Sequence, residues 1–67
     1  MLYIINSDST DSKYHETHHY DCGHRPSPQN QEELGNYYYD SVAMIFAKDR
    51  YDDADGCYYC MPTEHHG

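Results

Sequence analysis

Two pairs of residues that can bind a metal ion lie far apart in this chain. Cys57 and Cys60 are separated by two residues, and His18 and Cys22 are separated by three. A C-x2-C pair can direct two thiolates at one ion, and an H-x3-C pair can supply the other two ligands of a tetrahedron. Thiolate and imidazole ligands in this number are typical of a structural zinc site, so we predict that the four side chains bind one Zn2+.

The identity of the fourth ligand is open to alternatives, because the chain has six histidines. His24 follows Cys22 by two residues, and His65 follows Cys60 by five. Either imidazole could take the place of His18 in the same tetrahedral set. We therefore keep His24 and His65 as alternative fourth ligands.

The cysteines also indicate a compartment and argue against other cysteine chemistry. The chain has three of them, an odd number that does not suit a secreted disulfide framework, so we expect a reducing, cytoplasmic setting. The C-x2-C pair could instead be a redox pair, but such a motif usually opens a helix after a strand in a larger fold. Pro62, two residues after the motif, does not suit a helix there.

The short length explains why a metal ion would be needed. We treat residues 1–67 as a single small metal-binding domain, with the metal-site region over about residues 14–66. Hydrophobic residues make up 37% of the chain, but nine residues are tyrosines and few are aliphatic. Ordering the chain costs roughly 100 kcal/mol at about 1.5 kcal/mol per residue, and such a thin core does not offset that alone. Structural zinc contributes on the order of 10 kcal/mol to folding, so an ion can replace part of the interior.

An excess of acidic residues limits the classes of partner. Twelve Asp and Glu residues against four Lys and Arg give a net charge of -8. Binding to nucleic acid or to an anionic membrane needs basic side chains, so this composition opposes both. No stretch approaches the roughly 20 apolar residues of a membrane span, and Met1–Ile5 is too short for the apolar part of a signal peptide. We therefore expect a protein partner, no membrane association and no direct contact with nucleic acid.

Hydrophobic patterning predicts an α+β domain with one helix and two or three short antiparallel strands. The apolar run Leu2–Asn6 predicts a first strand, and weaker alternation over Lys13–Tyr20 predicts a second. Asn36–Tyr39 is a candidate third strand. Asp40 has the character of an N-cap for a helix over about residues 41–51. The apolar face expected for this helix consists of Val42, Ala43, Ile45, Phe46 and Ala47.

The residues between and around the two pairs follow the pattern of a known family. That pattern is a ligand, three residues, a Cys, a loop with an Asn, a short strand, an Ala-rich helix and a closing C-x-x-C-x-P. The matching residues are His18, Cys22, Asn30, Tyr37–Tyr39, Asp40, Ser41, Ala43, Ala47, Cys57, Cys60 and Pro62. In this respect the chain resembles the zinc-binding domain of the Ada methyl-phosphotriester repair protein and its short relatives. The chain is also similar to a group of small H-x3-C…C-x2-C proteins that have a Leu-Gly and a closing G-C-x-Y-C segment. Here Leu34-Gly35 and Asp55–Cys60 match these two features.

The resemblance covers roughly residues 14–66 and implies the fold and the zinc site of that family. In the Ada family one zinc-bound cysteine accepts an alkyl group from a DNA phosphotriester, and this reaction needs a basic surface along the DNA backbone. Here the first ligand is a histidine, only four residues are basic, and Asp55 brings acid close to the C-x2-C pair. We carry over the fold and the metal site, and alkyl transfer is the least favoured function.

We predict a small acidic structural-zinc protein that acts as a protein-interaction module, because tyrosine combines contact area with a hydrogen bond at interfaces. One alternative is an acidic inhibitor, of the kind that a phage makes as a DNA mimic, which occupies the basic groove of a nucleic-acid-binding protein. It depends on the acidic loop 49–55, which contains Asp49, Asp52, Asp53 and Asp55 and could equally be a solvated face. A further alternative is a zinc enzyme with Glu16 or Glu64 as general base. That enzyme needs an open coordination position, which a set of four protein ligands does not leave.

Overall fold

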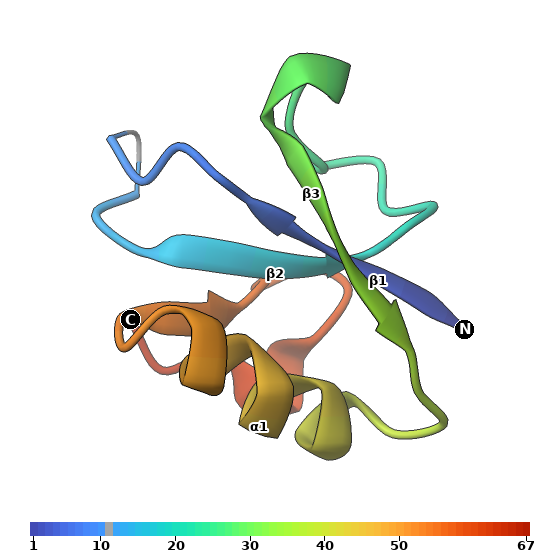
Figure 1. Cartoon of the computed structure of the whole chain (residues 1–67). Coiled ribbons are helices and arrows are strands. Elements are labelled where there is room, and N and C mark those ends of the chain that lie inside the picture. The colour runs from blue at the N-terminus through green and yellow to red at the C-terminus, as the bar shows by residue number, and fades with distance from the viewer. Residues whose placement is uncertain (11) are drawn as a thin grey trace.

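The computed structural model describes residues 1–10 and 12–67, which form a four-stranded mixed sheet with one α-helix across one face (Figure 1). The strands lie in the order β3-β1-β2-β4; β1 is antiparallel to both of its neighbours, whereas β2 and β4 are parallel. The elements are β1 (Leu2–Asn6), β2 (His15–His19), β3 (Gln31–Asn36), α1 (Asp40–Arg50) and β4 (Ala54–Gly56), with the short 3-10 helices η1 (Pro28–Asn30) and η2 (Pro62–Glu64).

The predicted α+β class is confirmed, but the sheet differs from the prediction in two strands. β1 has the predicted bounds, because its short continuous run of apolar residues gives a clear signal. The third strand is Gln31–Asn36 instead of Asn36–Tyr39, since β3 is a polar edge strand in which only Leu34 is fully buried. β4 has three residues, too few for a periodic pattern, and its parallel pairing makes the sheet mixed instead of antiparallel.

The hydrophobic core lies between α1 and one face of the sheet. Tyr3 and Ile5 of β1 point toward the helix, and side-chain alternation places Ile4 on the opposite face together with its register partner His18. The first candidate ligand therefore lies on the face of the sheet away from the main core. The core residues are Tyr3, Ile5, Leu34, Ala43, Met44, Ala47, Ala54 and Met61.

The helix has close to its predicted bounds but buries only part of its predicted apolar face. Ala43, Met44 and Ala47 are buried, whereas Ile45 and Phe46 are exposed, which corrects the predicted apolar face. Small alanine side chains let α1 lie close to the sheet. The side of the helix that carries these alanines therefore packs against the sheet. None of the helices in the part of the chain that the structure describes has the length and apolar character that a membrane crossing requires.

The start of the helix also differs from the prediction. Tyr39 occupies the N-cap position, and no side chain caps the helix there. Asp40 is the first helical residue, and its carboxylate accepts a hydrogen bond from the Tyr3 hydroxyl at 2.6 Å and contacts His19 Nε2 at 2.9 Å. A tertiary contact with β1 and β2 has therefore replaced the local cap that the sequence suggests.

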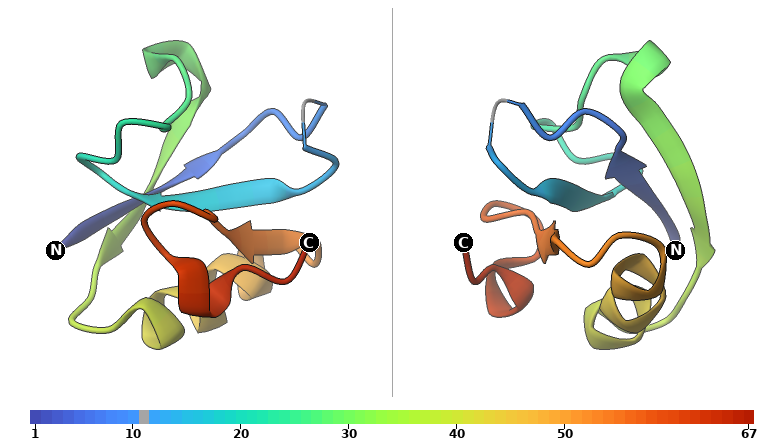
Figure 2. Two further views of the ribbon diagram at one scale, coloured as in Figure 1. Left: turned by 180° about the vertical axis from the view of Figure 1, so that it is seen from behind. Right: turned by 60° about the vertical axis from the view of Figure 1, so that its left-hand side comes forward.

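The C-terminal segment folds back beside β4, as Figure 2 shows from behind. The buried Asp55 carboxylate accepts hydrogen bonds from the backbone N–H groups of His66 and Gly67, both at 2.9 Å. Gly56 lies against η2, where an added Cβ would be 2.7 Å from the Cβ of Glu64 and 2.8 Å from its carbonyl carbon. This close approach leaves space only for glycine between β4 and η2.

Replacement of this glycine gives a test of the packing. Gly56→Ala should lower the free energy of unfolding by about 1–3 kcal/mol, because the new methyl group pushes the backbone of β4 away from that of η2. Gly23→Ala is the matched control, since an added Cβ at Gly23 meets nothing within 4 Å. Denaturant unfolding of both metal-loaded variants measures the difference, and equal stability of the two would contradict the packing described here.

Candidate metal centre

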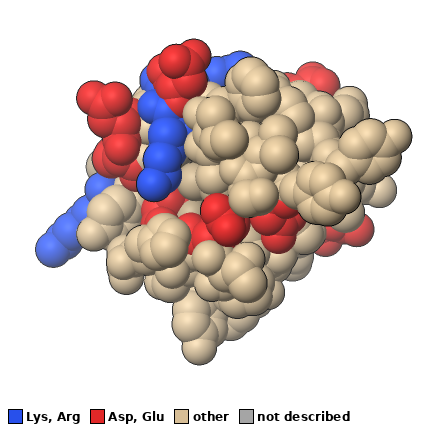
Figure 3. Space-filling view, turned by 90° about the horizontal axis from the view of Figure 1, so that it is seen from below, with Lys and Arg blue, Asp and Glu red and all other residues tan. Residues whose placement is uncertain are grey.

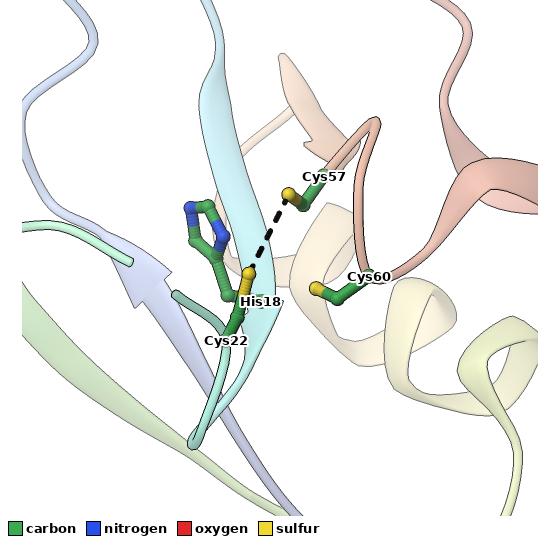
Figure 4. A group of neighbouring side chains, drawn as sticks. All are labelled: His18, Cys22, Cys57 and Cys60. Atoms are coloured by element: carbon green, nitrogen blue, oxygen red, sulfur yellow. Dashed lines mark hydrogen bonds between the residues drawn. The ribbon is translucent and has the colours of Figure 1, made fainter. Parts of the chain in front are cut away.

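The parallel pairing of β2 and β4 brings the two ligand pairs together. In this register Thr17 lies opposite Gly56, so that the next residues, His18 within β2 and Cys57 just after β4, lie side by side. The backbone N–H of Cys57 donates to the Thr17 carbonyl at 2.9 Å, which extends the ladder by one bond. Cys22 comes from the turn after β2, and Cys60 comes from the loop after β4. The four candidate ligand atoms all lie within 4.8 Å of one another (Figure 4).

Each sulfur of the cluster accepts one backbone N–H group. His24 N–H donates to Cys22 Sγ at 3.4 Å, and Tyr59 N–H donates to Cys57 Sγ at 3.4 Å, so the two loops repeat the same contact two residues after a cysteine. The third sulfur, Cys60 Sγ, accepts from the backbone N–H of His19 at 3.3 Å. Such donors stabilise thiolate charge and orient a sulfur toward an ion.

The His18 imidazole is buried, and one of its nitrogens has no protein partner. Its exposed fraction is 1%, and Nδ1 makes no hydrogen bond, whereas Nε2 lies 3.7 Å from Glu16 Oε1. Figure 4 shows the ring beside the three sulfurs. A buried nitrogen without a partner is costly, and a bound ion would satisfy it. The donor set therefore fits a metal ion, with Nδ1 as the ligand and the opposite ring edge toward a carboxylate, an arrangement common around metal-bound histidines.

Burial lowers the pKa of His18 and raises the pKa of the Cys57 and Cys60 thiols, and a bound cation would lower the pKa of those thiols again. Burial lowers the pKa of His18 from 6.5 to about 4, with smaller effects from the charges of His24 and His19, so the ring is neutral and ready to bind. Burial raises the pKa of the Cys57 and Cys60 thiols, because a charged sulfur is poorly solvated inside the protein. The Sγ atoms of Cys22 and Cys57 are 3.9 Å apart, so two thiolates there need a cation between them.

The structure places the two alternative ligands outside the cluster. His24 is exposed, and its ring stacks on Tyr59 with a centroid distance of 3.7 Å. His65 Nδ1 lies 3.0 Å from the Gly56 carbonyl oxygen and 3.2 Å from Asp55 Oδ2. Among the described residues the cluster thus consists of the four side chains that the spacing selects, and it can hold a metal ion.

Sequence reasoning does not find the residues that position the cluster. The hydrogen bond from the His19 backbone to Cys60 depends on β2, and the side chain of His19 is in turn fixed by Asp40. Asp40 is 21 residues from His19 in sequence, and no local pattern signals this contact. Only Glu16 can be inferred from the sequence, because it shares a strand face with His18.

Single substitutions of histidine should separate the ligand from its alternatives. His18→Ala should weaken zinc binding by more than about 100-fold, since loss of a residue that merely supports a ligand already costs about 10–100-fold. His24→Ala and His65→Ala should each retain one ion per chain with a change of less than about 10-fold, because their rings lie outside the cluster. Competition with a chromophoric chelator measures all three, and a large loss in either control would reassign the fourth ligand.

The apparent affinity for zinc should fall as the pH falls. At neutral pH the thiols of Cys57 and Cys60 are protonated and must each release a proton to bind the ion, whereas His18 is already neutral and releases none. The affinity should therefore decrease by at least about 100-fold per unit of pH between roughly pH 8 and pH 5.5, and His18 adds to this only near its own pKa of about 4. Zinc titrations across this range measure how the logarithm of the affinity changes per pH unit, which equals the number of protons released per ion. A release of fewer than one proton per ion would contradict thiolate ligation.

Comparison of the chain with protein-family models, with curated proteins and with solved structures finds no match. The resemblance to the Ada zinc-binding domain thus stays a prediction from the residues that carry it. The function proposed for this chain depends on the chain's own geometry.

Proposed function

We propose that this chain is a small protein-interaction module whose fold is held by a structural Zn2+ ion. The observation that carries the proposal is the closed cluster of three sulfurs and one imidazole, which joins the ends of β2 and β4. Three soft thiolates and one imidazole make a set of four ligands that suits tetrahedral coordination, and this set favours Zn2+ over cations that prefer oxygen ligands. An odd number of cysteines, all of them outside disulfides among the described residues, suits the reducing, cytoplasmic setting that we propose.

Several features support a structural role for the ion. His18, Cys22 and Cys57 are buried, and four protein ligands fill a tetrahedron without a position for substrate. The carboxylate of Glu16 faces the far edge of the His18 ring, so it is placed to orient a ligand. Glu64 packs against Gly56 and lines a surface hollow together with Met44 and Lys48 of α1. Neither glutamate has the placement expected of a general base acting on a zinc-bound water.

Exposed aromatic side chains support the binding role. A monomer of this size would not need so many large apolar groups in water, and tyrosine is enriched at protein interfaces. They come from the segments on either side of β2, the segment before α1, the helix itself and the loop between Cys57 and Cys60. The exposed large hydrophobic residues other than Met1 are Tyr14, Tyr20, Tyr38, Tyr39, Ile45, Phe46, Tyr58 and Tyr59.

The acidic loop gives weaker support to the alternative of a nucleic-acid mimic. Asp55 is 4% exposed and holds the C-terminal backbone, and Asp53 Oδ1 contacts His15 Nδ1 at 2.6 Å. Two of the four aspartates are therefore engaged in contacts within the chain, one of them buried and the other exposed. Asp49 and Asp52 are exposed, but two carboxylates do not resemble the regular phosphates of a duplex.

Native mass spectrometry tests the structural role of the ion. We expect one Zn2+ per chain and, after removal with EDTA, loss of the near-ultraviolet circular dichroism of the tyrosines, because the binding energy of the ion is folding energy. Addition of Zn2+ should restore both signals. A chain that stays fully ordered with no metal bound would overturn the proposal.

Affinity purification of a tagged chain tests the interaction role. The wild type should retain a protein partner in a stoichiometric amount, and the Cys57→Ser/Cys60→Ser double variant should lose it, because its metal loops are not held together. Absence of any stoichiometric partner from the zinc-loaded wild type would count against an interaction module.

A further inference from the structure

We propose that four aromatic rings around the metal loops bind an arginine-rich segment of a protein partner. We call this surface, made of His24, Tyr58, Tyr59 and His65, the aromatic platform. The inference depends on the proposed function, since it names the chemistry of the partner that the module would recognise.

The rings of the platform contact one another in a continuous row. The His24 ring stacks on Tyr59 at a centroid distance of 3.7 Å and an interplanar angle of 12°. Tyr59 meets Tyr58 edge to face at 5.2 Å, and Tyr58 meets His65 edge to face at 5.4 Å. The two tyrosines are nevertheless 62% and 64% exposed, so their outer surfaces face solvent. A surface whose side chains already pack together loses little conformational freedom when it binds a ligand.

The platform is built by the two metal loops. Tyr58 and Tyr59 are the residues between Cys57 and Cys60, and His24 follows Cys22 by two. The backbone N–H groups of His24 and Tyr59 each donate to the sulfur two residues earlier, so the same residues that hold the thiolates also carry the stacked rings. An ion that joins the two loops would therefore also fix the stacking of His24 on Tyr59.

Charge selects the kind of ligand. The chain carries a net charge of -8, and Zn2+ bound by three thiolates would add a site with one net negative charge between the two loops that carry the platform. The exposed Asp21 precedes Cys22, and Glu64 precedes His65. Figure 3 views the molecule from below, the side of α1, and shows Asp and Glu spread over this side, with Lys and Arg gathered toward one edge. A negative field next to exposed aromatic faces attracts cations.

Two of the four Lys and Arg side chains have partners within the chain. The guanidinium of Arg25 donates to the Cys22 carbonyl at 2.8 Å, and that of Arg50 pairs with Glu32 at 2.7 Å on the edge strand β3. Arginine fits this surface better than lysine, because its planar guanidinium is weakly hydrated and stacks on tyrosine faces. The net charge opposes a nucleic acid, which could otherwise stack its bases on the same rings.

A labelled peptide tests the proposal with the full zinc-loaded chain. The probe is a twelve-residue peptide of alternating Arg and Gly, and its binding is followed by fluorescence anisotropy at physiological salt. We expect Tyr58→Leu/Tyr59→Leu to weaken binding by at least about fivefold, since each cation–π contact is worth about 0.5–1 kcal/mol at exposed sites. Tyr38→Leu/Tyr39→Leu, which removes two exposed tyrosines without changing the charge, should bind like the wild type. A Lys–Gly peptide should bind the wild type at least a few-fold more weakly than the Arg–Gly peptide.

Three outcomes would overturn the proposal. They are no binding of the Arg–Gly peptide, equal losses in the two double variants, and tighter binding of a single-stranded oligonucleotide or a second copy of the chain at the platform. Zinc content and circular dichroism of each variant establish that it is folded. Should Tyr58→Leu/Tyr59→Leu not fold, the test is an NMR titration of the wild type with the Arg–Gly peptide. If the proposal is right, the changes in amide chemical shift concentrate at the four platform residues.

The result also separates this proposal from the proposed function. If the double platform variant retains the stoichiometric partner of the wild type while the Arg–Gly peptide does not bind, the module role stands and the arginine-rich ligand is wrong. If the chain has no partner and stays folded without metal, the module role itself fails.

Discussion

The parallel contact between β2 and β4 is the constraint on which the rest of this structure depends. It places the residue after Thr17 beside the residue after Gly56, and these are His18 and Cys57. The turn after each strand then returns a second ligand to the same point. A shift of one residue in this register would point His18 and Cys57 to different faces, because side chains alternate along strands. The register and the metal cluster therefore specify one another, although the two segments are distant in sequence.

The cluster is continuous with the hydrophobic core. Cys60 packs against the core residues, and its sulfur accepts the backbone N–H of His19. The His19 ring contacts Tyr3 edge to face at 5.3 Å and, together with the Tyr3 hydroxyl, meets the carboxylate of Asp40 at the first turn of α1. The start of the helix, two strands and one metal loop thus share a single network. An ion at the cluster would stabilise all of these elements at once, which is how so small a core can suffice.

The parts of this fold that the sequence reveals are those whose signals are local. Ligand spacing identifies the four side chains that the structure brings together, because the geometry of a C-x2-C or H-x3-C loop depends on a few adjacent residues. β1 and the bounds of α1 follow from short apolar patterns and are recovered closely. β3 and β4 escape detection, since one is polar on an edge and the other is only three residues long. The buried face of α1 is predicted in part: Ala43 and Ala47 are buried as expected, whereas Ile45 is exposed, because close packing against the sheet favours the smaller side chains.

Two pairs of tyrosines differ in what their hydroxyls and rings contact, and this difference bears on function. Tyr3 and Tyr51 have partners for their hydroxyls in Asp40 and Glu32, both at 2.6 Å, so they serve as interior residues with satisfied polar ends. Tyr58 and Tyr59 contact only each other and the two histidines of the platform among the described ring contacts, and most of their surface faces water. A small protein gains no core from rings placed this way, and it exposes apolar area that favours association. Because these two rings lie between two candidate metal ligands, the ion that would complete the interior would also hold this pair of exposed rings. Folding and recognition in this chain would then depend on the same four side chains.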